Sequence, residues 1–401
     1  MSGHVALAEA QQRLLAIAAP LGVETLPAAS CVGRYLAAAL TARRTQPAAD
    51  LSAMDGYAVN GAADGFWRLV GESAAGRPYT IRLAPGEAVR ISTGALMPAG
   101  AQAVLLQEEA IREQNHIAAI QGAEPSSRHI RRRGFDFIEG DIVLQPGTRI
   151  GPAQLALAMV AGHGAASLRV GRRPHVAVID SGDELASPDT LTWEEHQIPA
   201  SNGAMIAALA APFASSVKRL GPVADRMDAL ADVLARAEEA DVIVTSGGAS
   251  VGDHDLMRPA LEAWGATIDF WRVAMKPGKP LLIARKGETI VLGLPGNPVS
   301  SYVTAFLFLL PLLRRLAGAR APYPETLYLP LGGDLPMAGP RTEFVRARLV
   351  DGALVPLGSQ DSSALKALAT SDVLIRREIG VPPARAGELV PAYLLDSGTT
   401  A

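Results

Sequence analysis

The feature that most constrains the fold is an alternation of apolar strands, glycine-containing loops and helical segments that begins near His175. HVAVID is followed by SGDEL, DVIVTSGG precedes a helix expected from Asp255, and TIVLGLPG precedes a long helix expected from about Pro298. Such an alternation builds a right-handed parallel sheet with helices on both faces. Ligands of such a sheet bind where loops leave the carboxyl ends of the strands, so we expect the functional site at that edge.

The segments on either side of this alternation have other patterns. Residues 4–40 are predicted to be helical, with a break at Pro20 and a second short helix near Val32–Leu40. Short apolar segments between Gly and Pro turns predict a β module inside the N-terminal half and a small barrel or sandwich after Gly318. We therefore predict an α/β multidomain protein with three parts: an elongated N-terminal region over 1–170 with a β module inserted at about 47–147, a parallel α/β domain over 171–318, and a C-terminal, barrel-like β domain over 319–401.

Within the β module, three segments are predicted to be strands: Tyr79–Leu83, Ala88–Ile91 and Ala103–Leu106. A further helix is expected over Pro152–Ala161, because proline is favoured in the first turn of a helix.

Charge and cysteine content exclude several kinds of partner and site. The 401 residues include 37 Lys plus Arg and 40 Asp plus Glu, a net charge of -3, so no global basic field attracts nucleic acid or an anionic membrane. Cys31 is the only cysteine, which excludes intramolecular disulfides, cysteine-based zinc sites and iron-sulfur clusters. The longest apolar run, Val303–Leu313, is shorter than a membrane span. We expect a cytoplasmic protein that binds anions only at a local site.

Four loops have the composition of an anion site, and three of them follow predicted strands. They are Asp180–Leu185, Ser246–Asp255, Lys276–Pro280 and Gly293–Ser301. Their glycines let backbone N–H groups approach an anion, and Lys276 and Lys279 add positive charge. Glu184 and Asp255 suit a Mg²⁺ shared with phosphate oxygens. Any one of these loops could be an ordinary tight turn, but their convergence on one sheet edge predicts a ligand site.

The second loop also matches two catalytic patterns that its context disfavours. Gly248–Gly252 has the G-x-S-x-G spacing of a hydrolase nucleophile elbow. The only histidine after Ser250 is His254, on the same loop, which leaves no suitable triad histidine. Asp253 stands where a P-loop has lysine, so a Walker A site is disfavoured as well.

Three motifs in the N-terminal half are less specific. Asp55-Gly56 and Ser92–Ala95 are both compatible with simple turns. Arg131–Gly134, followed by Asp136, fits a solvated charge run, although three arginines before a glycine also suit a phosphate or an oxyanion.

Together these motifs resemble the MoeA family of molybdopterin molybdenumtransferases, whose eukaryotic relatives include the gephyrin E domain. The resemblance covers nearly the whole chain, through SAMDGYAV, STGALMPAGA, RRRG-F-D, SGDEL, SNGAMI, ADVIVTSGGASVGDHD, KPGKP, GLPGNPVSS, GPRTEFVRARL and LGSQDSSAL. It implies a reaction in which molybdate is inserted into the dithiolene of adenylylated molybdopterin. The phosphoanhydride is cleaved, and molybdenum cofactor and AMP are released.

The resemblance also implies site residues, a cofactor and partners. Catalytic roles are implied for Asp55, Thr93, Asp136, Glu184, Asp225, Asp255 and Lys276. Substrate binding is implied for Arg131, Ser246, Gly247, Gly248, Ser250, Arg272, Lys279, Pro295, Asn297, Pro298, Ser300, Arg341 and Ser362. Glu184 and Asp255 would bind Mg²⁺. Members form elongated homodimers with a site between the α/β domain of one subunit and the N-terminal half of the other, and contact with a molybdopterin adenylyltransferase is implied too.

Two alternatives remain open at this point. The first is a molybdopterin adenylyltransferase of the MogA or MoaB type, which shares the α/β domain but would not need the other ~250 residues. The second is a non-catalytic molybdopterin-binding scaffold, since a fold alone never fixes an activity. The sequence also departs from the family pattern at Asp180, where a small hydroxyl or apolar residue is more usual, at Arg272, where lysine is expected, and at Arg226, where a second acid often follows Asp225.

Overall fold

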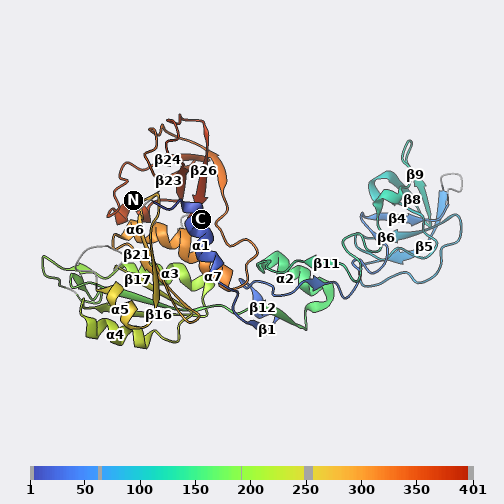
Figure 1. Ribbon diagram of the computed structural model, residues 1–401. Coiled ribbons are helices and arrows are strands. Elements are labelled where there is room, and N and C mark those ends of the chain that lie inside the picture. Colours follow the sequence, from blue (N-terminus) through green and yellow to red (C-terminus); the bar gives the residue numbers. More distant parts are fainter. Residues whose placement is uncertain (1–3, 62–65, 191, 248–255, 396–401) are drawn as a thin grey trace.

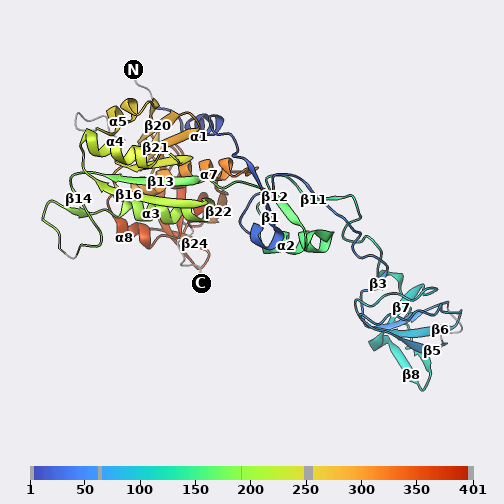
Figure 2. The ribbon, with the colours of Figure 1, turned by 90° about the horizontal axis from the view of Figure 1, so that it is seen from below.

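The computed structural model describes residues 4–61, 66–190, 192–247 and 256–395. The molecule is elongated: an α/β body and a C-terminal sheet lie at one end, and the N-terminal half extends from them as an arm that ends in a β module (Figures 1 and 2). The predicted fold class, α/β and multidomain, is confirmed.

The body is built on a six-stranded sheet with the order β16-β13-β17-β21-β20-β18. Its strands are β13 (His175–Ser181), β16 (Ser216–Val223), β17 (Val242–Ser246), β18 (Thr267–Arg272), β20 (Pro280–Lys286) and β21 (Thr289–Leu294). β16, β13, β17 and β21 are parallel, as predicted, but β20 pairs antiparallel with both of its neighbours. The sheet is therefore mixed, because only the tight turn at Gly287 separates β20 from β21, and so short a connection joins antiparallel strands.

Helices cover both faces of this sheet, as the alternation predicts. One face packs against α1 (Leu7–Ala16), α3 (Asn202–Ala210) and α6 (Pro298–Thr304) with its continuation, and the other packs against α4 (Met227–Arg236) and α5 (Met257–Ala263). Successive residues of β13 alternate between the two cores, as strand geometry requires.

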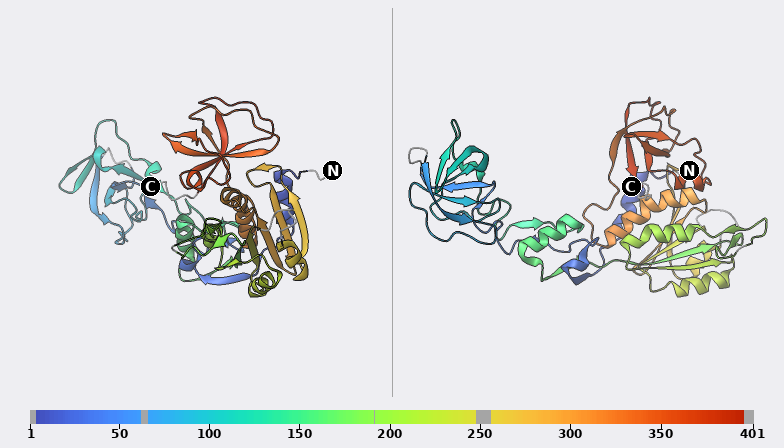
Figure 3. Two further views of the ribbon diagram at one scale, coloured as in Figure 1. Left: turned by 90° about the vertical axis from the view of Figure 1, so that its left-hand side faces the viewer. Right: turned by 180° about the vertical axis from the view of Figure 1, so that it is seen from behind.

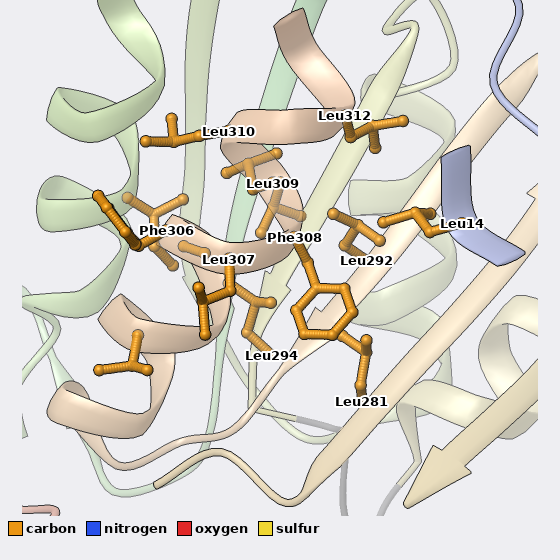
Figure 4. Close-up of a cluster of buried hydrophobic side chains, with 14 of the residues drawn as sticks. Leu14, Leu281, Leu292, Leu294, Phe306, Leu307, Phe308, Leu309, Leu310 and Leu312 are labelled. Atoms are coloured by element: carbon orange, nitrogen blue, oxygen red, sulfur yellow. The ribbon is translucent and has the colours of Figure 1, made fainter. Parts of the chain in front are cut away.

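The longest helix runs from α6 through a π-helical turn (Ala305–Leu309) into α7 (Leu310–Leu316). In Figure 4 its Phe308 points toward Leu281 of the sheet, and leucines from the helix and from β21 surround it. Pro298–Leu316 is long and apolar enough to cross a membrane, but 83% of its most apolar stretch is buried inside the protein. Its apolar character is thus that of a core helix.

The C-terminal sheet has the order β19-β23-β25-β26-β22, with β24 paired to β23. Its strands are β19 (Met275–Lys276), β22 (Leu327–Pro330), β23 (Thr342–Val350), β24 (Ala353–Pro356), β25 (Val373–Arg377) and β26 (Leu389–Leu394), and α8 (Leu365–Ala369) lies beside them. The α6–α7 helix lies between this sheet and the central one (Figure 3), where Phe306 packs against Tyr393 at 6.0 Å between ring centroids. β19 comes from the body, so it joins the two sheets.

The arm begins with β1 (Val23–Pro27), which pairs with β12 (Ser167–Gly171), and continues through β2 (Leu40–Thr41), which pairs with β11 (Ile142–Leu144). α2 (Pro152–Ala158) and a π-helical turn (Met159–His163) form the helix predicted at Pro152. The second helix predicted near Val32–Leu40 is wrong. Gly33 has a φ of +79°, which interrupts a helix, and Leu36 instead forms a bridge with Val170 of β12.

The module is a six-stranded sheet with the order β7-β4-β6-β5-β9-β8. Its strands are β4 (Gly56–Val59), β5 (Phe66–Ser73), β6 (Glu87–Ile91), β7 (Ala103–Leu106), β8 (Ala110–Glu113) and β9 (His116–Ala119), and β3 (Leu51–Ser52) pairs with β10 (Ile130–Arg131) at its base. Two of the three predicted strands are confirmed as β6 and β7. The third, Tyr79–Leu83, is wrong: this segment is irregular, and the Tyr79 ring packs over Gly71 of β5.

The remaining elements are short. β14 (Leu185–Ala186) pairs with β15 (Ile198–Pro199) beside the central sheet, and single 3₁₀ turns occur at Ala28–Cys31, Gln107–Glu109, Ser127–His129 and Ala211–Phe213.

Candidate functional site

A cleft of about 1190 Å³ opens where β13, β17 and β21 end, and loops of the C-terminal region form its opposite wall. Eleven of the residues predicted for the site line it: Glu184, Ser246, Gly247, Lys276, Lys279, Pro295, Asn297, Pro298, Ser300, Arg341 and Ser362. The four loops singled out in the sequence therefore contribute described residues to one cavity. Gly248, Ser250 and Asp255 lie outside the residues that the structure describes.

The loop after β17 lies close to the end of β13. Gly247 has a φ of +95°, and a Cβ built on it would lie 3.0 Å from the carbonyl oxygen of Ser181. Its N–H donates to Leu294 O at 3.2 Å, and Thr245 Oγ1 donates to its carbonyl at 3.1 Å. A larger residue would force these two strand ends apart, which explains the glycine.

The start of α6 is joined to the C-terminal region. Asn297 Nδ2 donates to Ser362 Oγ at 3.1 Å, and the N–H of Val299 donates to the carbonyl of Ser362 at 3.1 Å. Behind this loop, Arg346 is 1% exposed and donates from Nη2 to the carbonyls of Ser359 and Asp361, both at 3.0 Å. The buried guanidinium thus holds the loop against the helix start.

Lys276 is the most exposed of the three basic residues at this cleft, and it lies on β19, the edge strand of the C-terminal sheet. Its Nζ lies 3.4 Å from Glu343 Oε1, because β19 pairs with β23 at this position. Just over half of the Lys276 side chain is exposed, so its ammonium can reach an anion only by sharing or leaving Glu343. Arg341 donates from Nη1 to Met275 O at 3.4 Å on the same wall. Arg272, also predicted for the site, does not line the cleft.

Two predicted acids lie on neighbouring loops. The carboxylate of Glu184 lines the cleft and folds over Gly182, where a Cβ would lie 2.5 Å from Glu184 Oε2. Asp225 follows β16 and donates its N–H to Asp183 Oδ1 at 3.0 Å, but it does not line the cleft. Across the described parts of the chain, no group of three or more His, Cys, Asp or Glu side chains could hold a metal ion.

Asp180 lies at the floor of the cleft; it belongs to the first of the four predicted loops, although no individual role is predicted for it. It is 5% exposed, and burial raises the pKa of its carboxyl, while the N–H of Gly203 and the side chain of Ser246 hydrogen-bond to it and oppose the shift. A Cβ on Gly203 would lie only 2.0 Å from Asp180 Oδ2. Next to it, Asn202 Nδ2 donates to Gly296 O at 2.6 Å, which joins the start of α3 to the loop before α6.

The predicted residues of the N-terminal motifs lie away from this cleft, and two of the motifs are in contact. Thr93 donates its N–H to Asp55 Oδ1 at 2.7 Å, so the two motifs that contain them are in contact. Arg131 lies in β10 and pairs with Leu51 of β3, and Asp136 lines a separate pocket of about 340 Å³. None of these predicted residues lines the cleft, and Figure 1 shows the module at the far end of the arm.

Several residues of the cleft are absent from the individual site residues predicted from the sequence, although Asp180 and Ser181 belong to one of the predicted loops. They are Ser181, Ser201, Asn202, Gln360, Asp361 and Ser363, besides Asp180. The motifs SNGAMI and LGSQDSSAL contain most of them. Polar residues directly before a helix were therefore the signal that could have found them.

The fold and the cleft define an α/β protein that gathers glycine loops, a helix start and basic side chains around one cleft at the carboxyl ends of its strands. Family models agree with this class. The MoeA N-terminal region (domain I and II) matches residues 5–162, a probable molybdopterin binding domain matches 177–315, and the MoeA C-terminal region (domain IV) matches 328–395.

Curated relatives cover almost the whole chain. A molybdopterin molybdenumtransferase of Staphylococcus epidermidis is 31% identical over 381 residues, 92% of this chain and 90% of the relative. One from Nostoc sp. is 33% identical over 366 residues, 87% of this chain and 83% of the relative. The crystal structure of the molybdopterin biosynthesis MoeA protein of Pyrococcus horikoshii has a TM-score of 0.81 at 26% identity, and the match covers 98% and 100% of the two chains. The chain belongs to the molybdopterin molybdenumtransferase (MoeA) family, which confirms the resemblance of its motifs.

Proposed function

We propose that this protein is an enzyme of molybdenum cofactor biosynthesis that inserts molybdate into adenylylated molybdopterin and releases AMP and molybdenum cofactor. The observation that carries the proposal is the convergence on one cleft of the strand-end loops, the start of α6 and the side chains of Lys276, Lys279 and Arg341. The names of the curated relatives support the same activity.

Molybdate is a tetrahedral dianion, and it needs donors and cations that are fixed before it binds. The start of α6 offers Ser300, which lines the cleft and is 6% exposed, in the first turn of a helix whose dipole favours negative charge. Lys276 and Lys279 add charge from the adjacent loop. Because Glu343 already holds the Lys276 ammonium, it would set how strongly that cation attracts an oxyanion.

The nucleotide part of the substrate carries phosphates, which suit the glycine loop at Ser246-Gly247. Mg²⁺ belongs to the proposal: Glu184 lines the cleft and forms no ion pair with another described residue, so it fits one carboxylate ligand of a Mg²⁺ shared with phosphate oxygens. Such an ion would neutralise charge on the phosphoanhydride during cleavage. The second ligand that we propose, Asp255, lies outside the described residues.

A homodimer with shared sites would explain why the arm carries predicted site residues far from the cleft of its own chain. Asp55 and Thr93 form an exposed, hydrogen-bonded pair, and together with Asp136 they lie outside the cleft of their own chain. We propose that these residues complete the cleft of a second subunit, where the carboxylates would help to position the group that attacks the phosphoanhydride.

The curated relatives, which cover almost the whole chain, favour this activity over the two alternatives. A MogA- or MoaB-type adenylyltransferase would leave the arm and the C-terminal sheet without a role. A scaffold would not require Lys276, Lys279, Arg341 and Glu184 to line one cleft.

The experiment is to incubate the protein with adenylylated molybdopterin, Mg²⁺ and molybdate, and to measure AMP release and cofactor formation. We expect both to depend on molybdate and to fall strongly in Lys276→Ala. Lys286→Ala is the matched control, because Lys286 lies on β20 of the central sheet, pairs with Glu238 and stacks on Trp264, away from the cleft. Formation of adenylylated molybdopterin from ATP and molybdopterin, without cofactor formation, would instead identify an adenylyltransferase.

A further inference from the structure

Three guanidinium groups converge where the arm joins the body. A Cβ built on Gly33 would lie 2.8 Å from Arg173 Nη2 and 3.9 Å from Arg149 Nη2. Arg149 and Arg314 both stack on the ring of Phe213, with their Cζ atoms 5.7 and 4.8 Å from its centroid. We call Arg149, Arg173 and Arg314 the junction cluster. Arg173 lies in the chain between β12 of the arm and β13 of the central sheet, which Figure 2 shows on either side of the junction.

The charges of the junction cluster are only partly compensated by acids within the described part of the chain: Glu24 acts on Arg173 from a distance. None of its three arginines forms an ion pair there, although neighbouring arginines do: Arg34 pairs with Glu24, and Arg172 Nη2 lies 2.7 Å from Asp241 Oδ1. Arg314 Nη1 donates to a backbone carbonyl, that of Pro322, at 3.2 Å. The face of Phe213 attracts guanidinium groups but has no net charge, so it leaves their mutual repulsion in place.

Burial makes this arrangement costly. Arg173 and Arg314 are only partly exposed, and burial lowers the pKa of each guanidinium. The positive charge of Arg149 adds to both shifts, and that of Arg34 adds to the shift of Arg173. Tyr35, 7% exposed, lies within electrostatic reach of all three cluster arginines and offers a hydroxyl beside them.

A cavity adjoins the cluster. It has a volume of about 550 Å³, and Arg149 and Arg314 line it together with Phe213 and other apolar side chains. Glu325 also lines it, but it makes no ion pair with either arginine. The cations therefore border a space that can admit a ligand.

We propose that the junction cluster is a second anion site, separate from the cleft, that binds a tetrahedral oxyanion of the phosphate or sulfate class. Guanidinium groups bind such oxyanions through paired, charge-assisted hydrogen bonds. The site includes residues of both parts of the molecule, Tyr35 and Arg149 from the arm and Arg173 and Arg314 from the body. A bound oxyanion would therefore fix the arm that carries Asp55 relative to the cleft.

This inference goes beyond the proposed function, and its test does not depend on activity. Phosphate is titrated calorimetrically into the protein, and thermal unfolding is followed in phosphate, in sulfate and in chloride at one ionic strength. We expect saturable phosphate binding and a higher unfolding temperature in phosphate and sulfate than in chloride. Lys276→Ala removes a cation of the cleft, so it should keep the part of the increase that comes from the junction and lose only what phosphate or sulfate binding in the cleft adds.

Arg149→Gln is the decisive variant, because Arg149 is exposed and its replacement should not disturb folding. We expect phosphate binding at the junction to weaken about 10-fold or more, as one charge-assisted contact is lost. In chloride the variant should unfold at a higher temperature than the wild type, since repulsion is relieved, and in phosphate this order should reverse. Arg149→Lys keeps the charge and should keep part of the binding. Arg169→Gln, an exposed arginine of β12 outside the cluster, should behave as the wild type.

Three results would overturn the proposal. Phosphate stabilisation that is unchanged in Arg149→Gln, or that disappears in Lys276→Ala, would place the ligand elsewhere. A wild-type protein that binds no phosphate, combined with weaker self-association of Arg149→Gln in sedimentation experiments, would assign the cluster to acidic side chains of a second copy.

Discussion

Replacing Gly203 by alanine tests how tightly the floor of the cleft is packed. The added Cβ would lie 2.0 Å from Oδ2, 2.7 Å from Cγ and 3.0 Å from Oδ1 of Asp180, all shorter than a normal contact. The carboxyl cannot swing into solvent, because Asp180 is 5% exposed and lies between α3 and the strand end at Ser246. Either the start of α3 or the end of β13 must therefore move.

The expected loss follows from this geometry. Overpacking of a closed site costs about 1–3 kcal/mol. Alanine is favoured over glycine in a helix by up to about 1 kcal/mol, which offsets part of that cost. We therefore expect Gly203→Ala to lower the local stability of α3 by about 1–2 kcal/mol. In Asp180→Ala/Gly203→Ala the clash is gone, so the two changes should be coupled by about 1–2 kcal/mol, within the range found for residues in contact.

Amide hydrogen exchange within α3 is the appropriate assay, because it reports local opening and does not require the whole elongated chain to unfold in one step. The wild type, both single variants and the double variant complete the cycle. The reasoning is refuted if Gly203→Ala protects α3 as well as glycine does, or if the effects of the two substitutions simply add.

Three further predictions concern the cleft and its completion. Lys276→Ala should raise the molybdate concentration for half-maximal cofactor formation about 10-fold or more, while the half-maximal concentration of adenylylated molybdopterin should change little. Glu343→Gln should lower the half-maximal molybdate concentration, because it frees the Lys276 ammonium. Equal weakening for both substrates in Lys276→Ala would place Lys276 at the phosphates. Mixing Asp55→Ala with Glu184→Ala should restore part of the activity in heterodimers, and no recovery despite proven subunit exchange would contradict a shared site. Because the pKa of Asp180 is raised in the folded protein, its contribution to stability is complete below the unfolded value of about 3.9 and is lost as pH rises through the folded value. We therefore expect the urea concentration at the unfolding midpoint to fall less steeply with rising pH above pH 4 in Asp180→Asn than in the wild type. An unchanged pH profile would count against a buried, titrating Asp180.

The location of the cleft could be predicted from sequence because its signals are local. Each of the loops at Glu184, Gly247 and Asn297 follows a short apolar strand, and parallel strands bring their carboxyl ends to one edge. The reversed direction of β20 follows from the short turn at Gly287, which is also a local signal. The turn predicts an antiparallel pair only when the ends of the two strands beside it are already known. The predicted domain boundaries near 170 and 318 stay predictions.

Other features depend on pairings between distant segments, which periodicity does not reveal. Lys276 meets Glu343 only because β19 leaves the body and pairs with β23, 67 residues further along the chain. The predicted helix near Val32–Leu40 failed for a similar reason: its apolar residues pack against β12, and Gly33 takes a φ that a helix does not allow.

The predicted site residues divide between the two ends of the molecule, and the two groups are held in place in different ways. Residues of the cleft are held by contacts that cross between the body and the C-terminal region, such as Asn297 with Ser362 and Lys276 with Glu343. Asp55 is held by its own module: Thr93 fixes its carboxylate, and the next residue, Gly56, lies so close to β7 that a Cβ would be 2.0 Å from Leu105 O. An acid fixed so locally keeps its orientation wherever the module lies. That is what the shared site proposed above requires of Asp55, since the cleft it would complete belongs to another subunit.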